Sequence, residues 1–464
     1  MHGDFSLNPL NYRERVSRVL YQQGRVQLDS DFNEQTESTL RFLRGLAQDV
    51  IGFHGGAGRS FKIIGDSAPK KTFRVAWGEY YVDGIRCVNL PGDLWDIIGS
   101  KQKMADIGDG REITSHTDSY WDADAKFDEP QLLYLAAWEQ HISAAERDEI
   151  REVALNGPDT ASRAAVVWQI RAIAVEEVGK LARELMKDLG LSDPAKAGTD
   201  PNAWKVDPVY LALNLTLRSS ARLKAFAKEN QDLEPCTISP EARYRGGENR
   251  LYRVEIHQGG DDKTATYKWS PDNGAIVFPV REIEGKTVFL DSLGRDERTA
   301  IMKNDWVEVI DDSITLRRQV NKLVQVTDVD RHRMTVTLSA EPDNNAGSDP
   351  DLHPILRRWA GDAKPVKLNT DVDLDDGVKV QFSLDAPPSG LFRHGDYWLI
   401  PARAATGDVI WPGGKNTPEA LRPHGVDEHY APLALFNPMA TADADRYKDF
   451  RWRFQPIADP VTHP

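Results

Sequence analysis

The stretch ATYKWSPDNGAIVFPV, residues 265–280, decides the fold class of this chain. It contains two runs of aromatic and β-branched residues on either side of a Pro-Asp-Asn-Gly turn. Residues of these types fit the pleated surface of a sheet, and the Asn-Gly pair favours a tight turn. The stretch therefore predicts two short strands joined by a turn.

Similar runs follow one another from Cys236 onward. They are separated by Gly, Asp and Asn residues, and they cover residues 249–260, 305–312, 321–338, 377–384 and 395–412. Short strands at such close intervals are typical of small β-barrels and β-sandwiches. No repeat of fixed period occurs, so the pattern indicates neither a solenoid nor a propeller.

Strand signals also occur in the first part of the chain. Residues 61–90 have strand composition with a tight turn at Asp83–Gly84. Residues 132–142 and 164–175 predict buried strands. Residues 95–130 are polar and acidic and predict a long surface loop.

Two helices are expected near the N-terminus. Tyr12, Val16, Val19 and Leu20 lie at helical spacing. A second helix is expected to start at Asp31, with Glu34 three residues later as in a capping box, and to end at Gly52. The stripe that this second helix is expected to bury consists of Phe32, Leu40, Leu43, Leu46 and Ala47.

A further amphipathic helix is predicted over residues 175–190, where Val178, Leu181, Leu185 and Leu189 share a face. It is followed by a linker rich in Pro, Gly, Ala and Asp at residues 192–204. The segment 209–230 fits either a strand or a helix.

These patterns predict an α+β protein that is mainly β. A helical N-terminal segment is followed by several small β-barrel or β-sandwich-like domains with a helical insertion. The expected division is an N-terminal docking segment, a first β-rich domain, a helical insertion with linker, a second β domain and a C-terminal β domain. Their bounds are 1–60, 61–175, 176–235, 236–345 and 346–464.

The charge of the chain argues against nucleic acid as a partner. There are 72 acidic and 58 basic residues, a formal net charge of −14, and no stripe of Lys and Arg with interleaved aromatics. The two cysteines, Cys87 and Cys236, form neither a disulfide framework nor a zinc motif. Residues 1–15 lack the apolar core of a signal peptide, and no apolar run of eighteen residues occurs, so we expect production in the cytoplasm and no membrane insertion.

The strongest metal motif is the acidic stretch at residues 371–377. Asp371, Asp373 and Asp375 have the spacing of the first three ligands of an EF-hand loop. Asp376 stands where that loop requires Gly, and Phe382 where it requires Glu, so an exposed acidic turn is the better interpretation, with a weak Ca²⁺ site as the alternative.

A second polar cluster is the stretch GVDEHY, which contains Asp427, Glu428 and His429 near Trp411 and His424. Glu428 and His429 have the chemistry of an acid–base pair. However, adjacent residues on a strand point to opposite faces. A metal or catalytic role is therefore not predicted for them.

The tryptophans of the β region have two interpretations. Twelve are present in the chain, and a shared face would make a sugar-stacking platform, whereas buried rings would serve core or interface packing. The set concerned is Trp269, Trp306, Trp359, Trp398 and Trp411. Packing in the core or in an interface is the favoured interpretation of these tryptophans.

Familiar catalytic motifs are absent from the sequence. It contains no GxSxG elbow, Walker loop, HExxH or GxGxxG fingerprint, and the stretch HGGAGRS at 54–60 lacks the Lys of a phosphate cradle. We therefore predict no catalytic, cofactor-binding or metal-ligating residues, no cofactor and no enzymatic activity.

Several stretches together resemble a phage-tail-associated family whose function is formally unassigned. They follow the family's order along nearly the whole chain, while residues 176–232 match nothing and are interpreted as an insertion. The matching stretches are Gly3–Ser6, Val19–Gln35, Arg151–Arg163, Val167–Arg171, Tyr244–Gly260, Tyr267–Val277, Gly395–Pro412 and His429–Leu435. Phe32 stands where the family often has Trp.

The resemblance implies a structural subunit of a contractile injection system or phage-tail-like particle, as a baseplate, cage or spike-adaptor component. It implies other baseplate, spike or tube proteins as partners, and a homo-oligomer of threefold or sixfold symmetry is expected. A carbohydrate-binding module on the particle tip and a carried glycan hydrolase are the alternatives.

If the chain is a structural subunit, the segment at residues 22–35 is predicted to dock it to the particle. Val26 and Leu28 form its apolar anchor, and polar groups around them supply hydrogen bonds. The predicted docking residues are Gln22, Gln23, Arg25, Val26, Leu28, Asp31 and Phe32. Deletion of residues 1–35 is expected to release the subunit while the rest of the chain still folds.

Overall fold

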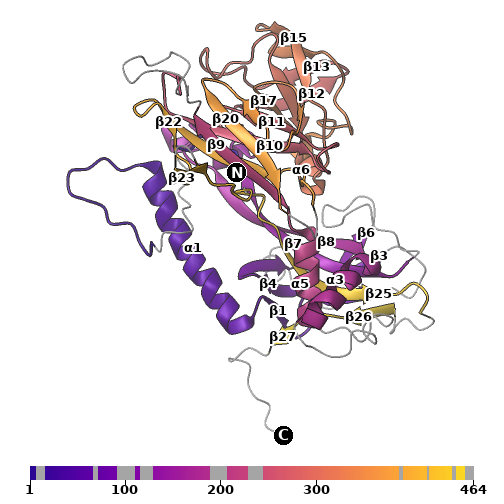
Figure 1. The fold of residues 1–464 in the computed structure, drawn as a ribbon. Helices are drawn as coiled ribbons and strands as arrows, with labels where there is room; N and C mark the ends of the chain where they lie inside the picture. Colours follow the sequence, from indigo (N-terminus) through magenta and orange to yellow (C-terminus); the bar gives the residue numbers. More distant parts are fainter. Residues whose placement is uncertain are drawn as a thin grey trace. The chain divides into compact units, whose positions relative to one another are not determined.

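The computed structural model describes residues 1–6, 16–65, 72–90, 110–114, 129–188, 206–227, 244–385, 390–414, 417–440 and 446–454. Strands dominate them, as expected, and they form several sheets and one closed barrel (Figure 1). The chain divides into two compact units. The first contains residues 1–38, 140–165 and 219–426, and the second contains residues 39–139, 166–218 and 427–464.

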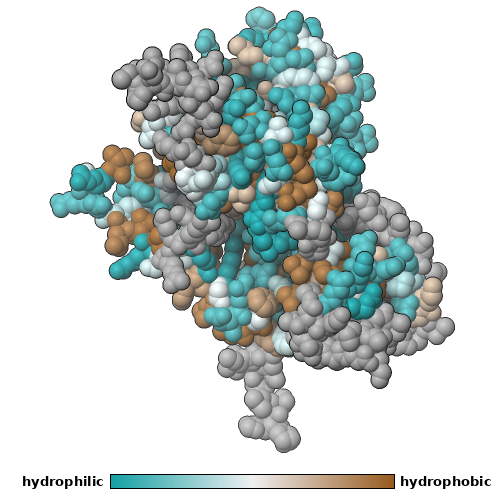
Figure 2. Space-filling model, viewed as in Figure 1, coloured by the Kyte–Doolittle hydropathy of each residue, from teal (hydrophilic) through white to brown (hydrophobic). Residues whose placement is uncertain are grey.

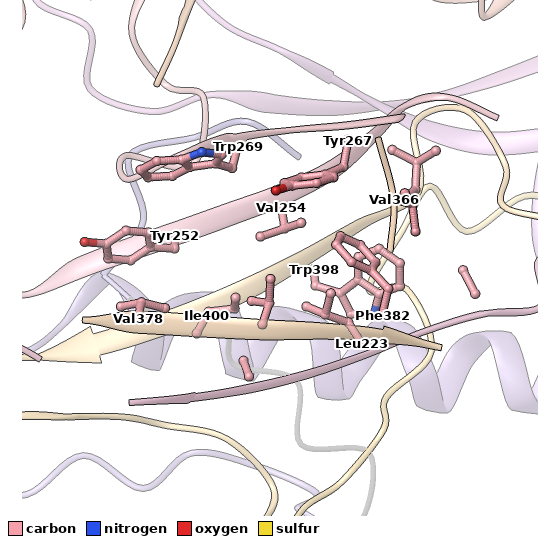
Figure 3. Close-up of a cluster of buried hydrophobic side chains, with 14 of the residues drawn as sticks. Leu223, Tyr252, Val254, Tyr267, Trp269, Val366, Val378, Phe382, Trp398 and Ile400 are labelled. Carbon is pink, nitrogen blue, oxygen red and sulfur yellow. The ribbon is translucent and has the colours of Figure 1, made fainter. Parts of the chain in front are cut away.

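The first unit contains a β-sandwich. One layer is the sheet β18-β11-β10-β21-β22, and the other is the sheet β19-β20-β9. The strands are β9 (Ala221–Ala227), β10 (Arg250–Gln258), β11 (Thr266–Ser270), β18 (Lys364–Pro365), β19 (Asp371–Asp373), β20 (Val378–Leu384), β21 (Tyr397–Arg403) and β22 (Asp408–Val409). Figure 3 shows side chains of both layers gathered into one buried cluster, among them Tyr252, Leu223, Phe382 and Trp398.

The first unit also contains the closed barrel, which confirms the expectation of small barrels and sandwiches. Its strand order is β12-β13-β16-β15-β14-β17. The strands are β12 (Val277–Glu284), β13 (Thr287–Leu290), β14 (Trp306–Ile310), β15 (Val324–Asp330), β16 (Thr335–Leu338) and β17 (Ile355–Trp359), with helix α6 (Asp312–Arg317) between β14 and β15. Valines 288, 307, 326 and 336 fill its interior together with Leu356.

The stretch at residues 265–280 joins these two parts of the first unit. β11 pairs with β10 and β18, whereas β12 pairs with β13 and β17. The predicted turn between β11 and β12 is present, with positive φ at Asn273 and Gly274. It therefore leads from the sandwich into the barrel and does not close a hairpin.

The second unit is built from three small sheets and two helices. The strand orders are β27-β1-β4-β5, β2-β3-β6 and β26-β25-β7-β8. The strands are β1 (His54–Ala57), β2 (Ile63–Gly65), β3 (Thr72–Ala76), β4 (Gly78–Val82), β5 (Ile85–Asn89), β6 (Gly110–Thr114), β7 (Gln131–Ile142), β8 (Arg163–Ala174), β25 (His429–Phe436), β26 (Tyr447–Asp449) and β27 (Arg453–Phe454), and the helices are α3 (Val175–Asp188) and α5 (Val206–Leu217). Shorter elements elsewhere are β23 (Gly413–Gly414), β24 (Thr417–Pro418) and the 3₁₀ turns η2 (Asp148–Ile150), η3 (Val153–Leu155) and η5 (Pro350–Leu352).

Several local predictions are confirmed in this unit. The Asp83–Gly84 turn joins β4 to β5, with positive φ at both residues. The predicted strands at 132–142 and 164–175 are β7 and β8. The predicted helix from residue 175 is α3, with Val178 buried.

Other predictions require correction or lie outside the described residues. The ambiguous segment 209–230 contains both helix α5 and strand β9. The predicted loop at 95–130 contains the strand β6. Residues 16–20 are not helical, and the linker at 192–204 lies outside the described residues, as do residues 12–15.

The N-terminal helix α1 runs from Asp29 to Ile51, two residues earlier than predicted, and ends at Gly52, whose φ is positive. The division between the two units falls within this helix.

Candidate functional site: an exposed apolar surface on the connector and helix α1

Five of the seven predicted docking residues lie on an exposed connector that precedes helix α1, and the other two, Asp31 and Phe32, lie in the helix itself. We define the connector as residues 16–28, which contain no helix or strand. A turn closed by the Arg25 amide and the Gln22 carbonyl reverses the chain around Gly24. Gln22, Gln23, Arg25, Val26 and Leu28 are all exposed, Val26 to 85%.

The connector is held against the first turns of α1. The Val19 amide donates to Oε1 of Gln35 at 2.9 Å, and the ring of Tyr21 lies 5.4 Å from that of Phe32. These contacts fix the connector backbone. The side chains of Leu20, Val26 and Leu28 nevertheless remain in solvent.

Asp31 has a structural contact that differs from the one predicted. Because α1 begins at Asp29, Asp31 is the third residue of the helix, and its carboxylate accepts a hydrogen bond from the Leu28 amide at 3.2 Å. This is the carboxylate half of a capping arrangement, shifted from the predicted pair of Asp31 with Glu34. Asp31 therefore stabilises the start of the helix.

The first six residues attach the connector and helix to the sandwich. Ser6 donates to Asp29 through its amide at 2.9 Å and through its hydroxyl, and its carbonyl accepts from Arg403 at 2.7 Å. Burial alone would raise the pKa of Asp29, but the hydrogen bonds from Ser6 lower it. The helix start is thus tied to strand β21.

Further inward, the N-terminal residues enter a buried network of charges. Nε2 of His2 lies 3.2 Å from the Glu255 carboxylate, and Asn273 donates to the Gly3 carbonyl at 2.8 Å. Arg253 donates to Glu255 at 2.5 Å, and Nζ of Lys268 lies 3.4 Å from it. Burial together with the charge of Arg253 lowers the pKa of His2 well below its usual value, so His2 is neutral.

Helix α1 exposes its apolar face, which an amphipathic helix of a monomeric soluble protein normally packs against the core. The exposed side chains are Phe32, Phe42, Leu43, Leu46 and Val50, with Phe42 at 70%, whereas the buried residues of α1 are Ser30 and Ser38. Figure 2 shows hydrophobic side chains along the segment that Figure 1 labels α1 and along the connector.

This finding corrects the predicted burial of α1. Phe32, Leu43 and Leu46 are exposed, while Leu40 and Ala47 are half-buried. The periodicity was interpreted correctly as one apolar face, but no described residue covers it. Covering one Phe, Leu or Val side chain is worth roughly 1.5–3 kcal/mol, so the uncovered face represents a substantial driving force for association.

The polar cluster around His429 lies in the second unit and is an ion network. Nδ1 of His429 lies 2.8 Å from Asp83 and its Nε2 lies 3.5 Å from Asp427, while Tyr210 donates to Asp83 at 2.7 Å. Burial alone would lower the pKa of His429, but the two carboxylates raise it to about 9. His429 is therefore a cation at neutral pH and cannot act as a general base.

Glu428 faces away from His429, as the strand alternation predicts. It accepts two hydrogen bonds from Arg171 and one from the Tyr430 hydroxyl at 2.6 Å. His424 accepts a hydrogen bond from the Leu399 amide, and burial lowers its pKa to about 4. These residues have structural partners and form no acid–base pair.

The acidic stretch at 371–377 has its own counter-ion. Nζ of Lys379 lies 4.0 Å from Asp371 and 3.6 Å from Asp373, whose side chains are exposed. Among the described residues, no group of three or more His, Cys, Asp or Glu side chains is arranged to hold a metal ion.

The tryptophans serve packing, as favoured. Trp269, Trp359 and Trp398 are buried, and the indole of Trp398 donates to the Leu421 carbonyl at 3.0 Å. Trp306 and Trp411 are half-buried. Three of the five rings are thus unavailable for stacking on a sugar.

The fold and surface define a mainly β protein with an uncovered amphipathic helix. The chain belongs to a family of unknown function (DUF6519), whose model matches residues 1–206 and 210–461. No functionally curated protein matches it. In the part of the chain that the structure describes, no helix is long and apolar enough to cross a membrane.

Among solved structures, the chain was matched to a crystal structure of TssK. The match covers 80% of this chain and 99% of that chain, at 8% sequence identity and a TM-score of 0.18.

Proposed function

We propose that this protein is a structural subunit that docks onto other proteins of a larger assembly through the connector and helix α1. The observation that carries the proposal is the exposed apolar face of α1, which includes Phe42, Leu43 and Leu46; Val26 and Leu28 of the connector are exposed as well. Contiguous exposed apolar surface of this kind marks interaction sites on soluble proteins.

The anchoring of α1 also favours docking. The hydrogen bond from Val19 to Gln35 holds the connector to the helix, and that from Ser6 to Asp29 holds the helix start, so the first turns of α1 have a fixed backbone. A preorganised surface loses less conformational entropy on binding than a disordered one. Phe and Leu side chains on such a surface are suitable anchors for the centre of an interface.

The kind of assembly is proposed from the sequence resemblance. The stretches from Gly3–Ser6 to His429–Leu435 resemble a phage-tail-associated family, and we propose a baseplate, cage or spike-adaptor role in a contractile injection system or phage-tail-like particle. The partners would be other baseplate, spike or tube proteins. On this proposal the subunit is made in the cytoplasm, joins the particle there and catalyses no reaction.

Point substitutions test this proposal better than deletion of residues 1–35. Such a deletion would also remove His2 and Gly3 from the buried network of the first unit, so loss of docking and loss of fold would coincide. Replacement of Leu46 by Gln keeps helix propensity and removes apolar surface. Leu155→Gln is the matched control, because Leu155 is 65% exposed on the 3₁₀ turn η3.

The experiment is purification of particles from cells that produce each variant in place of the natural chain. We expect Leu46→Gln to reduce incorporation strongly, with an unchanged circular dichroism spectrum, and Leu155→Gln to incorporate normally. Normal incorporation of both Leu46→Gln and a Leu43→Gln/Leu46→Gln double variant would refute docking by α1.

A further inference from the structure

The exposed face of α1 has a one-sided charge pattern that bears on the identity of its partner. At about 100° per residue, Phe32, Phe42, Leu43, Leu46 and Val50 fall within an arc of about 100°. The only other residues within this arc are Gln35 and Thr39, which are uncharged. The apolar stripe therefore carries no charge of its own.

Among the residues of α1, both borders of the stripe carry only acidic charges. Asp31 and Asp49 lie about 20° beyond Phe42 on one border, and Asp29 lies about 40° beyond Leu43 on the other. The basic residues of the helix lie on its opposite side. Arg41 and Arg44 are each about 150° from the centre of the stripe, and Arg44 donates to Glu139 at 2.8 Å.

This pattern argues against a second copy of α1 as the partner. In an antiparallel pair, Asp31 of one copy would lie beside Asp49 of the other. In a parallel pair, the charged border residues would again all be aspartates. Neither arrangement forms an attractive ion pair, and like charges at helix borders destabilise pairing.

We infer that α1 binds an amphipathic helix of a different chain, whose apolar stripe is flanked by Lys or Arg. This inference rests on the proposed function and names the chemistry of the partner. Basic flanks would pair with Asp31 and Asp49 while the apolar side chains cover Phe42 and Leu46. The formal net charge of −14 also attracts a basic partner and so speeds its diffusional encounter with the chain.

The test uses the full chain and two synthetic amphipathic peptides with the same leucine stripe, one flanked by lysines and the other by glutamates. Fluorescence anisotropy measures the Kd of each at low and raised salt. The lysine-flanked peptide is expected to bind roughly fivefold or more tightly than the glutamate-flanked one, with the preference weakened by salt.

Variants assign the binding to α1. Leu46→Gln is expected to abolish binding of both peptides, and Leu155→Gln to leave it unchanged. Asp49→Lys is expected to remove most of the preference for the lysine-flanked peptide. Asp262→Lys is the charge control, because Asp262 is exposed outside α1.

Three results would overturn the inference. They are equal binding of the two peptides, self-association of the chain in sedimentation that Leu46→Gln abolishes, and binding to neutral or anionic phospholipid vesicles that Leu46→Gln abolishes. The last two identify a second copy or a membrane as the occupant. If Leu46→Gln still blocks incorporation into particles while peptide charge has no effect on binding, docking through α1 is supported and the inference of a basic partner helix is refuted.

Discussion

The imidazole of His2 lies 3.2 Å from the carboxylate of Glu255, a residue 253 positions away in the sequence. This contact places the N-terminal peptide within the first unit, next to the layer of charges formed by Arg253, Lys268 and Glu308 between the sandwich and the barrel. Nζ of Lys268 bridges Glu255 and Glu308 and lies 4.3 Å from the ring centre of Trp359. The buried charges are therefore mutually paired.

Removing one charge from this network is expected to destabilise the first unit strongly. Glu255→Gln leaves Arg253 and Lys268 buried with fewer countercharges, which costs about 3–5 kcal/mol when one partner of a buried pair is lost. Denaturant unfolding should show this loss. Glu341→Gln, at an exposed position, is the control and should change the free energy of unfolding by less than about 0.5 kcal/mol. Equal stability of the two variants would contradict a role for the network.

The His429 cluster predicts a loss of stability at alkaline pH. Its pKa is about 9 in the folded chain against an ordinary value of 6.5. The folded state thus holds the proton more tightly, so the stabilisation is complete below about pH 6.5 and is lost as pH rises through about 9. In His429→Gln this alkaline decline should be smaller by about 3 kcal/mol than in the natural chain. His332→Gln, at an exposed histidine, should retain the full decline.

Asp396 also predicts a loss of stability as pH rises, but its pKa is raised by burial and not by neighbouring charges. Burial raises the pKa of Asp396 to about 7, against hydrogen bonds from the Ser219 hydroxyl and the Arg393 amide and the charge of Arg318. The folded state keeps the proton that the unfolded chain loses, so its contribution to stability falls as pH rises from about 4 to about 7. Asp396→Asn should flatten that fall in urea unfolding, and Asp262→Asn should not. A fall of the same size in Asp396→Asn would assign it to other groups.

The close approach of α1 to the β4–β5 turn can be tested with two glycines. A Cβ on Gly84 would lie 2.4 Å from the Arg44 carbonyl oxygen, whereas a Cβ on Gly58 meets nothing within 4 Å, and both residues have positive φ. Gly84→Ala and Gly58→Ala share the conformational cost, so their difference reports the contact with α1. We expect Gly84→Ala to lower the free energy of unfolding by about 1–3 kcal/mol more than Gly58→Ala. Equal losses of unfolding free energy in the two variants would mean that α1 can shift away from the turn without destabilising the fold.

Local patterns predicted the elements that depend on neighbouring residues. The Asp83–Gly84 turn, strand β7 and helix α3 follow from turn chemistry, apolar runs and helical periodicity. The closure of the barrel could not be predicted in this way. It depends on pairings such as that of β14 with β17, which lie far apart in the chain.

The docking site stays a prediction. Val26 and Leu28 are its predicted apolar anchor, and the structure shows that both side chains are exposed. The spacing of Leu43 and Leu46 indicated an apolar face, but spacing alone does not say whether the same chain covers that face. Likewise the contact of His2 with Glu255 leaves no local signal, since neither residue lies in a motif.

The interleaved division of the chain has a consequence for its biosynthesis. Strand β25 pairs with β7 along seven residues, yet the two are separated by nearly the whole of the first unit. While the ribosome is still translating the barrel, β7 therefore lacks its pairing with β25. We expect nascent chains halted before residue 429 to be digested by protease within residues 129–174, and completed chains to resist it there.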